Sequence, residues 1–193
     1  MVFMRRFALV PLFALLLTGC GSSSSSTTVA CDQQFWNGTV AVCLPSGWKV
    51  LDSALLSSRQ VPEETIAAFQ YSTPHAGQMD TVTVVREPLA SDTTTTAYAE
   101  ANVLAVSTLP DYKLIDKQTI TIDGETSSLH VFSARLNPSE PIRRYYQSYA
   151  ASDRTGYTFT GSFPLSIADS EAVQIQFILK NVSLKDPTAG EEK

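Results

Sequence analysis

The segment YKLIDKQTITIDGETSSLHVFSARL, residues 112–136, contains two long strand patterns joined by the dipeptide Asp123-Gly124. Asp-Gly between β-rich flanks is among the strongest short signals of a β-hairpin, because it accepts the left-handed backbone of a tight turn. Two further strand patterns follow, IRRYYQSYAA at residues 142–151 and YTFTGSF at residues 157–163. This part of the chain is therefore predicted to be a meander of about four antiparallel strands.

Further strand patterns precede the meander, and two helical patterns flank it. TVAVCL (39–44), TIAAFQYS (65–72) and DTVTVVRE (80–87) have the composition or alternation of strands. The two helices are predicted over residues 91–110 and 169–182. Antiparallel strands with a few helices indicate an α+β domain, and we expect one twisted antiparallel sheet with both helices packed on it.

The apolar residues of each helical pattern suggest which side is buried. In the first helix a stripe recurs at three- and four-residue steps, which is typical of a core-facing surface; its members are Ala97, Ala101, Leu104, Ala105 and Leu109. Ser91, Asp92 or an early Thr is expected to cap this helix. In the closing helix, Val173, Phe177 and Ile178 are expected to pack against the sheet.

The order and spacing of five segments resemble the PsbP-like fold family over residues 38–185. The family includes photosystem PsbP proteins, the lipoprotein DcrB, mycobacterial LpqN-type lipoproteins and Ran-binding relatives. The segments are LPSGW (44–48), AYAEANVLAVSTLP (97–110), DGETSSLHVFSA (123–134), YTFTGSF (157–163) and QFILKNVSL (176–184). The resemblance implies a PsbP-like fold and a protein that binds partners or assists assembly without being an enzyme. Fold alone does not determine function.

The N-terminus has the pattern of a bacterial lipoprotein signal. Arg5 and Arg6 precede an apolar run from Phe7 to Leu17, which is shorter than the roughly 20 residues that a membrane-spanning helix needs. Leu17-Thr18-Gly19-Cys20 resembles a lipobox, which implies cleavage before Cys20 and transfer of fatty acyl (palmitate) chains to its thiol. The alternative is an ordinary signal peptide that contains a chance cysteine.

These patterns divide the chain into four parts. Residues 1–19 are predicted to be the signal peptide, and residues 20–30 the lipidated Cys20 with a flexible Ser/Thr tether. Residues 31–185 are predicted to form the domain, and residues 186–193 a polar tail. By the same resemblance, the lipid anchors the protein in the cell envelope, and Gly21 rather than Asp after the cysteine favours the outer membrane, facing the periplasm, if the bacterium is Gram-negative.

The chain is acidic. Its formal net charge is −5, and loss of residues 1–19, with their two arginines, makes it −7. Phosphate backbones require basic patches, so we do not expect nucleic acid as a partner. The expected partners are the membrane, through the N-terminal lipid, and another envelope protein.

Cys31 and Cys43 flank a second hairpin signal, Asn37-Gly38. A hairpin turn there brings the two cysteines to within about one residue of register, and exported proteins fold where disulfides persist. We therefore predict a Cys31–Cys43 disulfide. The alternative, a pair of catalytic thiols, is disfavoured because redox dithiols usually occur as Cys-x-x-Cys.

The remaining residues contain no recognised catalytic, cofactor or metal motif. His75 and His130 are the only histidines; we interpret the first as a solvated loop residue and the second as a hydrogen-bonded sheet residue. A zinc site needs three or four clustered ligands, and the sequence offers no such cluster, so neither a metal nor a cofactor is expected. Glu63-Glu64 is interpreted as a helix-start charge rather than a catalytic pair.

Aromatic residues suggest a surface for binding. Arg143, Tyr145 and Tyr149 occupy alternate positions of the strand predicted over residues 142–151, so they share one face of it. Tyr and Arg are favoured at binding hot spots. The alternative is that the tyrosine rings pack beneath a helix. Trp48 and Tyr98 are expected to line a cleft between the sheet and the first helix. Three functions follow: a protein-binding or assembly module, a binder of small hydrophobic or lipid-like ligands, and, less favoured, a hydrolase.

Overall fold

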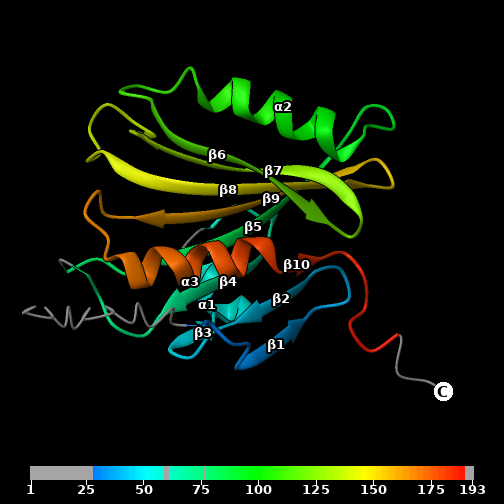
Figure 1. Ribbon diagram of the computed structural model, residues 1–193, viewed down its shortest axis with the longest axis horizontal. Coiled ribbons are helices and arrows are strands. Elements are labelled where there is room, and N and C mark those ends of the chain that lie inside the picture. The colour runs from blue at the N-terminus through cyan, green and yellow to red at the C-terminus, as the bar shows by residue number, and fades with distance from the viewer. Residues whose placement is uncertain (1–27, 59–60, 76, 190–193) are drawn as a thin grey trace, which may run out of the picture.

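A computed structural model describes residues 28–58, 61–75 and 77–189 (Figure 1). The predicted signal peptide, Cys20 and most of the tether lie outside the described residues. The larger sheet has seven strands, and neighbouring strands are antiparallel throughout. In pairing order they are β3 (Trp48–Val50), β4 (Thr65–Tyr71), β5 (Thr81–Pro88), β9 (Thr155–Phe163), β8 (Arg143–Ser152), β7 (Glu125–Ala134) and β6 (Lys113–Ile122).

The predicted meander is present as β6, β7, β8 and β9, four consecutive strands that pair in chain order. The β6–β7 hairpin closes between Ile122 and Glu125. Asp123 and Gly124 have φ angles of +53° and +93°, the left-handed backbone that a two-residue hairpin turn requires. The Asp-Gly dipeptide therefore sets the register of two of the three longest strands.

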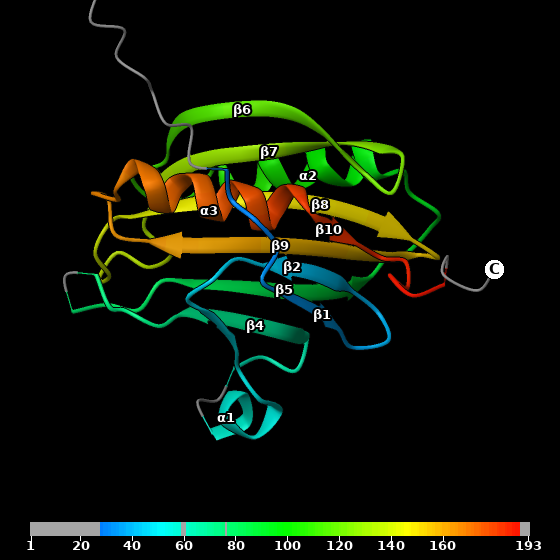
Figure 2. The same cartoon turned by 60° about the horizontal axis from the view of Figure 1, so that its bottom comes forward.

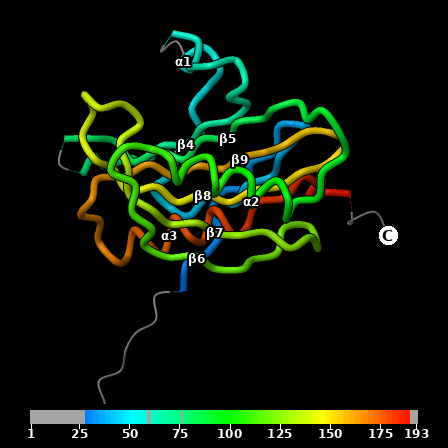
Figure 3. The backbone as a smooth tube through the Cα atoms, turned by 90° about the horizontal axis from the view of Figure 1, so that it is seen from above, coloured from blue at the N-terminus to red at the C-terminus, as the bar shows by residue number. Residues whose placement is uncertain are grey.

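Two longer helices cover opposite faces of this sheet: α2 (Thr95–Val106) and α3 (Asp169–Lys180), shown in Figures 1 and 2. A short helix, α1 (Ser53–Ser58), lies beside β4 and away from both (Figure 3). The α+β architecture is confirmed. No helix within the described ranges is long and apolar enough to span a bilayer.

The buried side of α2 differs from the predicted one. Ala97, Ala101 and Ala105 are exposed, and Leu104 is 71% exposed, so only Leu109 of the predicted stripe packs against the core. The helix carries a second, equally regular stripe whose members face the sheet: Thr95, Tyr98, Ala99, Val103 and Val106. Burial of Tyr and Val removes more apolar area from water than burial of Ala, so the second stripe is the buried one.

The start of α2 and the packing of α3 are set by particular side chains. Thr94 Oγ1 accepts the N–H of Ala97 at 3.2 Å and caps α2, as an early Thr was expected to do. In α3, Val173 is 48% exposed, contrary to prediction. The residues that seal the helix onto the sheet are Ile175, Ile178 and Leu179.

The first hairpin does not join the large sheet, which corrects the expectation of a single sheet. β1 (Gln33–Trp36), β2 (Ala41–Leu44) and β10 (Val182–Ser183) form a separate three-stranded sheet. Val42 and Leu44 of β2, with Val40 just before it, share one apolar core with α3. The small sheet therefore lies on the same face of the large sheet as α3.

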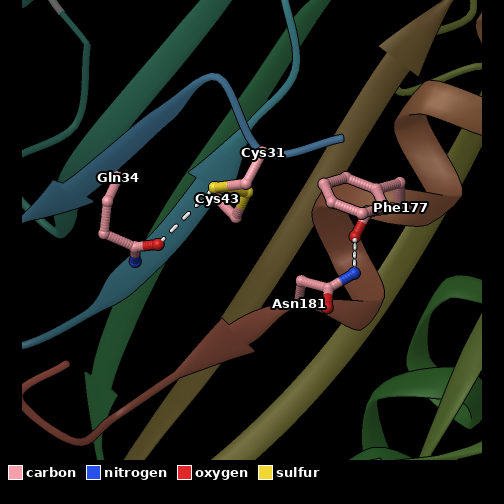
Figure 4. The surroundings of a disulfide bond; sticks show 5 residues. All are labelled: Cys31, Gln34, Cys43, Phe177 and Asn181. Atoms are coloured by element: carbon pink, nitrogen blue, oxygen red, sulfur yellow. Dashed lines mark hydrogen bonds between the residues drawn. A yellow bond between two sulfur atoms is a disulfide. The ribbon is translucent and has the colours of Figure 1, made fainter. Parts of the chain in front are cut away.

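The hairpin loop has four residues rather than two. Trp36 pairs with Ala41, and Asn37 Oδ1 accepts the N–H groups of both Thr39 and Val40 at 3.0 Å. Cys31 is consequently not opposite Cys43 in the β1–β2 ladder. The chain before β1 nevertheless returns to β2, and the predicted Cys31–Cys43 disulfide is present with a Cα–Cα distance of 5.4 Å (Figure 4).

We expect replacement of both Cys31 and Cys43 by Ser to lower the free energy of unfolding by about 3 kcal/mol, because a closed loop of this size restricts the unfolded chain. Urea titrations of both forms measure the difference. The matched control is Cys20→Ser, which removes a cysteine outside the disulfide and should leave the unfolding midpoint unchanged. Equal midpoints for the double variant and the parent chain would contradict the prediction.

Candidate functional site

The five residues predicted to form a binding surface do not lie together on the exterior. Tyr145 and Tyr149 are buried beneath α2, and Tyr98 of α2 is buried against Tyr149. Trp48 is also buried, but in the core on the α3 side of the sheet. Trp48 and Tyr98 therefore pack in different clusters rather than lining one cleft, and the tyrosine rings pack under a helix, as in the alternative interpretation.

The buried tyrosines satisfy their hydroxyls internally. Tyr98 Oη donates to Glu87 Oε1 at 2.7 Å, and Tyr149 Oη donates to Gln147 Oε1 at 2.8 Å. Burial raises the pKa of Tyr98 to about 12 and raises the pKa of Tyr149 as well. Gly156 packs so closely under Tyr98 that a Cβ there would lie 2.4 Å from the ring. These contacts make Tyr98 and Tyr149 structural.

Arg143, the fifth residue, connects the start of β8 to two neighbouring segments. Its Nε donates to Ser162 Oγ at 2.8 Å, and its Nη1 donates to Gln78 Oε1 in the loop between β4 and β5. Gln78 and His75 exchange two backbone hydrogen bonds across that loop, at 2.7 and 2.8 Å. Arg143 therefore helps to hold the segment that carries His75.

His75 lies between two carboxylates that sequence reasoning did not connect with it. Its Nδ1 is 2.6 Å from Asp80 Oδ2, and its Nε2 contacts Glu171 Oε1 in the first turn of α3. The hydrogen bond to Asp80 raises the pKa of His75, whereas burial raises the pKa of Asp80 against the opposing effect of the imidazole. The interpretation of His75 as a purely solvated loop residue is wrong.

The cluster of His75, Asp80 and Glu171 has ligand atoms within 4.8 Å of one another. Glu171 is held in place because its Oε2 also accepts the N–H of Ala168 at 3.3 Å. Asp80 Oδ1 is buried and has no hydrogen-bond partner among the described residues. Asp80 lies five residues from His75 and Glu171 lies 96, so only the fold brings the third member to the pair.

This arrangement does not favour the hydrolase hypothesis. A serine hydrolase needs one imidazole nitrogen free for the nucleophile while the other is held by a carboxylate. In His75 both nitrogens contact carboxylates. Within the described part of the chain, no serine forms a hydrogen bond to either histidine ring.

His130 lies in β7 beneath α2 and is fully buried. Its Nε2 is 3.0 Å from Tyr112 Oη, and its ring stacks on Phe132 with a centroid distance of 4.8 Å. Burial lowers the pKa of His130 to about 4. The interpretation as a hydrogen-bonded sheet residue agrees with these contacts, which keep the ring neutral.

A groove of about 750 Å³ opens where the starts of β6 and β8 meet the loop before α3. We name it the Arg144 groove; its apolar residues are Leu114, Ile115, Ile142 and Leu165, and its cations are Lys113 and Arg144. Leu114, Ile115 and Leu165 are 51%, 44% and 45% exposed. Three of the six exposed large apolar side chains of the described residues thus gather here.

The cations of the Arg144 groove are not paired with any described carboxylate. No ion pair to Arg144 or Lys113 occurs among the described residues, and Arg144 Nε is buried without a hydrogen-bond partner there. Asp111, at the groove rim, instead accepts a hydrogen bond from Arg135 Nε at 2.6 Å. The groove therefore offers apolar surface next to unpaired positive charge.

Solved structures share this fold. A cyanobacterial PsbP (CyanoP) from Synechocystis has a TM-score of 0.54 and 14% identity, covering 86% of this chain and 100% of its own. The chain has a PsbP-like fold. The Ran-binding protein Mog1p of Saccharomyces cerevisiae has a TM-score of 0.53 and 10% identity, with coverage of 80% of this chain and 94% of its own.

A third structure, LpqN of Mycobacterium tuberculosis, described as involved in cell envelope biogenesis, has a TM-score of 0.49 and 15% identity. It covers 76% of this chain and 83% of its own. No family model matches the sequence, and no curated protein matches it.

Because His130 is buried as a neutral imidazole, we expect the protein to lose stability in acid. Above pH 6.5 the imidazole is neutral in both states; below it the unfolded chain takes up a proton that the folded chain does not accept until about pH 4. The free energy of unfolding should therefore fall by up to about 3 kcal/mol over this range through this group. Urea titrations between pH 7 and pH 4 should show a weaker pH dependence for His130→Phe than for the parent chain.

The control is Tyr112→Phe, which removes the hydrogen-bond partner of His130 but leaves the buried imidazole. It should lower stability at every pH and retain the acid dependence. Parallel curves for His130→Phe and the parent chain would show that the ring does not resist protonation.

Proposed function

We propose that this protein is a lipid-anchored accessory protein of the bacterial cell envelope, which binds another protein and catalyses no reaction. The lipobox-like Leu17-Thr18-Gly19-Cys20 and the serine tract after it support the anchor. Two or more acyl chains give stable membrane attachment. A tether of this composition would let the domain reach partners near the membrane surface.

The fold is compatible with a binding role. Mog1p, which shares it, is by its name a Ran-binding protein, and CyanoP is by its name a cyanobacterial PsbP. The occupied nitrogens of His75 are a further reason to favour binding over His-dependent hydrolysis.

The observation that carries the proposal is the Arg144 groove. Exposed apolar side chains that cluster on a monomer surface mark interaction sites more often than scattered ones do. Unpaired Arg144 and Lys113 would attract an acidic segment of the partner, and Arg is a residue type that often dominates binding energy. We therefore expect a partner segment that combines apolar side chains with carboxylates.

The second candidate function uses the same groove. A volume of about 750 Å³ falls within the range of small-molecule sites, and the carboxylate or phosphate of a lipid-like molecule would pair with Arg144. The groove is open to solvent, and charged residues are among those that line it. These features favour a protein segment over a ligand that must bury an entire hydrocarbon chain.

A photoreactive amino acid at Ile115 should crosslink the protein to a specific envelope protein in intact cells. The matched control carries the same amino acid at Leu104, which is more exposed but belongs to α2 and does not line the groove. Charge reversal by Arg144→Glu should abolish the Ile115 product, which mass spectrometry identifies. Absence of any Ile115-specific product, with a lipid mass bound to the purified chain and lost on Arg144→Glu, would favour the second candidate.

Replacement of Cys20 by Ser should abolish incorporation of radioactive palmitate and leave an uncleaved N-terminus, because the thiol is the proposed acceptor. Labelling of cells followed by intact-mass analysis measures both effects. Cys31→Ser is the control and should still be labelled. Persistent labelling of Cys20→Ser would refute the anchor and leave the groove proposal to the crosslinking experiment.

A further inference from the structure

We infer that His75, Asp80 and Glu171 form a binding site for a single Zn²⁺ ion, which would link the loop before β5 to the first turn of α3. Imidazole nitrogen and carboxylate oxygen are both ordinary zinc ligands, and tetrahedral zinc often has three protein ligands and one water. The three side chains each offer one such atom, two from the loop between β4 and β5 and one from α3.

The spacing of the ligand atoms suits one small ion. Around tetrahedral Zn²⁺, with metal–ligand distances of about 2.0–2.1 Å, ligand atoms are separated by about 3.4 Å. Here they lie within 4.8 Å of one another, and the imidazole already contacts both carboxylates. The two carboxylates contact different imidazole nitrogens, so zinc binding would require the partly exposed His75 ring to turn until one nitrogen faces both of them.

A separate observation concerns Asp80. Its side chain is only 2% exposed, and its Oδ1 has no hydrogen-bond partner among the described residues although Oδ2 contacts His75. A buried carboxylate oxygen without a partner is costly. An ion pair with His75 leaves that oxygen unsatisfied, whereas a bound cation would supply the missing partner.

The charges around the cluster also favour a cation. Two carboxylates face one imidazole, so the cluster is negative even when the ring is protonated. Arg143 is the nearby cation, but its guanidinium donates to Ser162 and Gln78 rather than to either carboxylate. A divalent ion would neutralise the excess charge. The imidazole favours Zn²⁺ over Mg²⁺, because nitrogen ligands suit zinc better.

The surroundings would hold the ligands in place. Tyr71 stacks on His75 with a centroid distance of 6.2 Å, and Ala168 donates its N–H to Glu171. One turn further along α3, Gln174 Oε1 accepts the indole N–H of Trp48 at 3.0 Å. The helix turn that carries Glu171 is therefore anchored independently of the ion.

Isothermal titration of the full chain in detergent with ZnCl₂ alone should show one equivalent bound, and MgCl₂ at the same concentration should give no signal. Glu171→Gln keeps the shape of the side chain and removes its charge, and should weaken zinc binding at least tenfold. Glu64→Gln, an exposed acid outside the cluster, is the matched control and should bind as the parent does. The titration is repeated on the Cys20→Ser variant, which lacks the thiol of Cys20.

His75→Gln is the second variant, since it removes the nitrogen ligand from a partly exposed position where folding is less at risk than at Asp80. X-ray absorption of the loaded parent chain should show one nitrogen and oxygen ligands, with no sulfur. Absence of zinc binding to the parent would overturn the inference. Binding that survives both Glu171→Gln and His75→Gln, or disappears with Cys20→Ser, would overturn it equally, because the ion would then lie elsewhere.

Discussion

The structure depends on strand β8 being buried on both faces. Tyr145 and Tyr149 face α2, while Tyr146 and Ala150 face the core that α3 and the small sheet complete. Because β8 is buried on both faces, each face needs an element packed against it, and both helices are required for this. Large aromatic side chains give each cover a wide apolar area, and the alternation of side chains along a strand assigns them to the two layers.

The sequence was sufficient to predict features whose pattern lies within a short segment of the chain. Asp123-Gly124 and the alternation in residues 142–163 predicted the meander, and the hairpin signal between Cys31 and Cys43 predicted the disulfide. The side of α2 that is buried was not predictable from periodicity, because two apolar stripes run along that helix. The stripe with Tyr98 and Val103 is the buried one because it offers more apolar side-chain area than Leu104 and its neighbouring alanines.

The candidate sites escaped prediction for a different reason. The cluster around His75 needs Glu171, which lies 96 residues away and reaches the loop only because α3 crosses that end of the sheet. The Arg144 groove likewise combines the starts of β6 and β8 with Leu165. Neither set has a spacing that marks it in the chain. Conversely, the tyrosines that stood out in the sequence are core residues, since composition alone does not distinguish an aromatic interior from an aromatic surface.

The position of the disulfide has a mechanical consequence. Cys31 is among the first described residues, and its partner Cys43 belongs to β2, the middle strand of the small sheet, which also pairs with β10 near the C-terminus. Tension applied to the chain ahead of residue 31 therefore passes through the sulfur bridge directly into the middle of that sheet. β1 is bypassed and cannot be peeled away from its N-terminal end, so a domain pulled from that side would resist unravelling there.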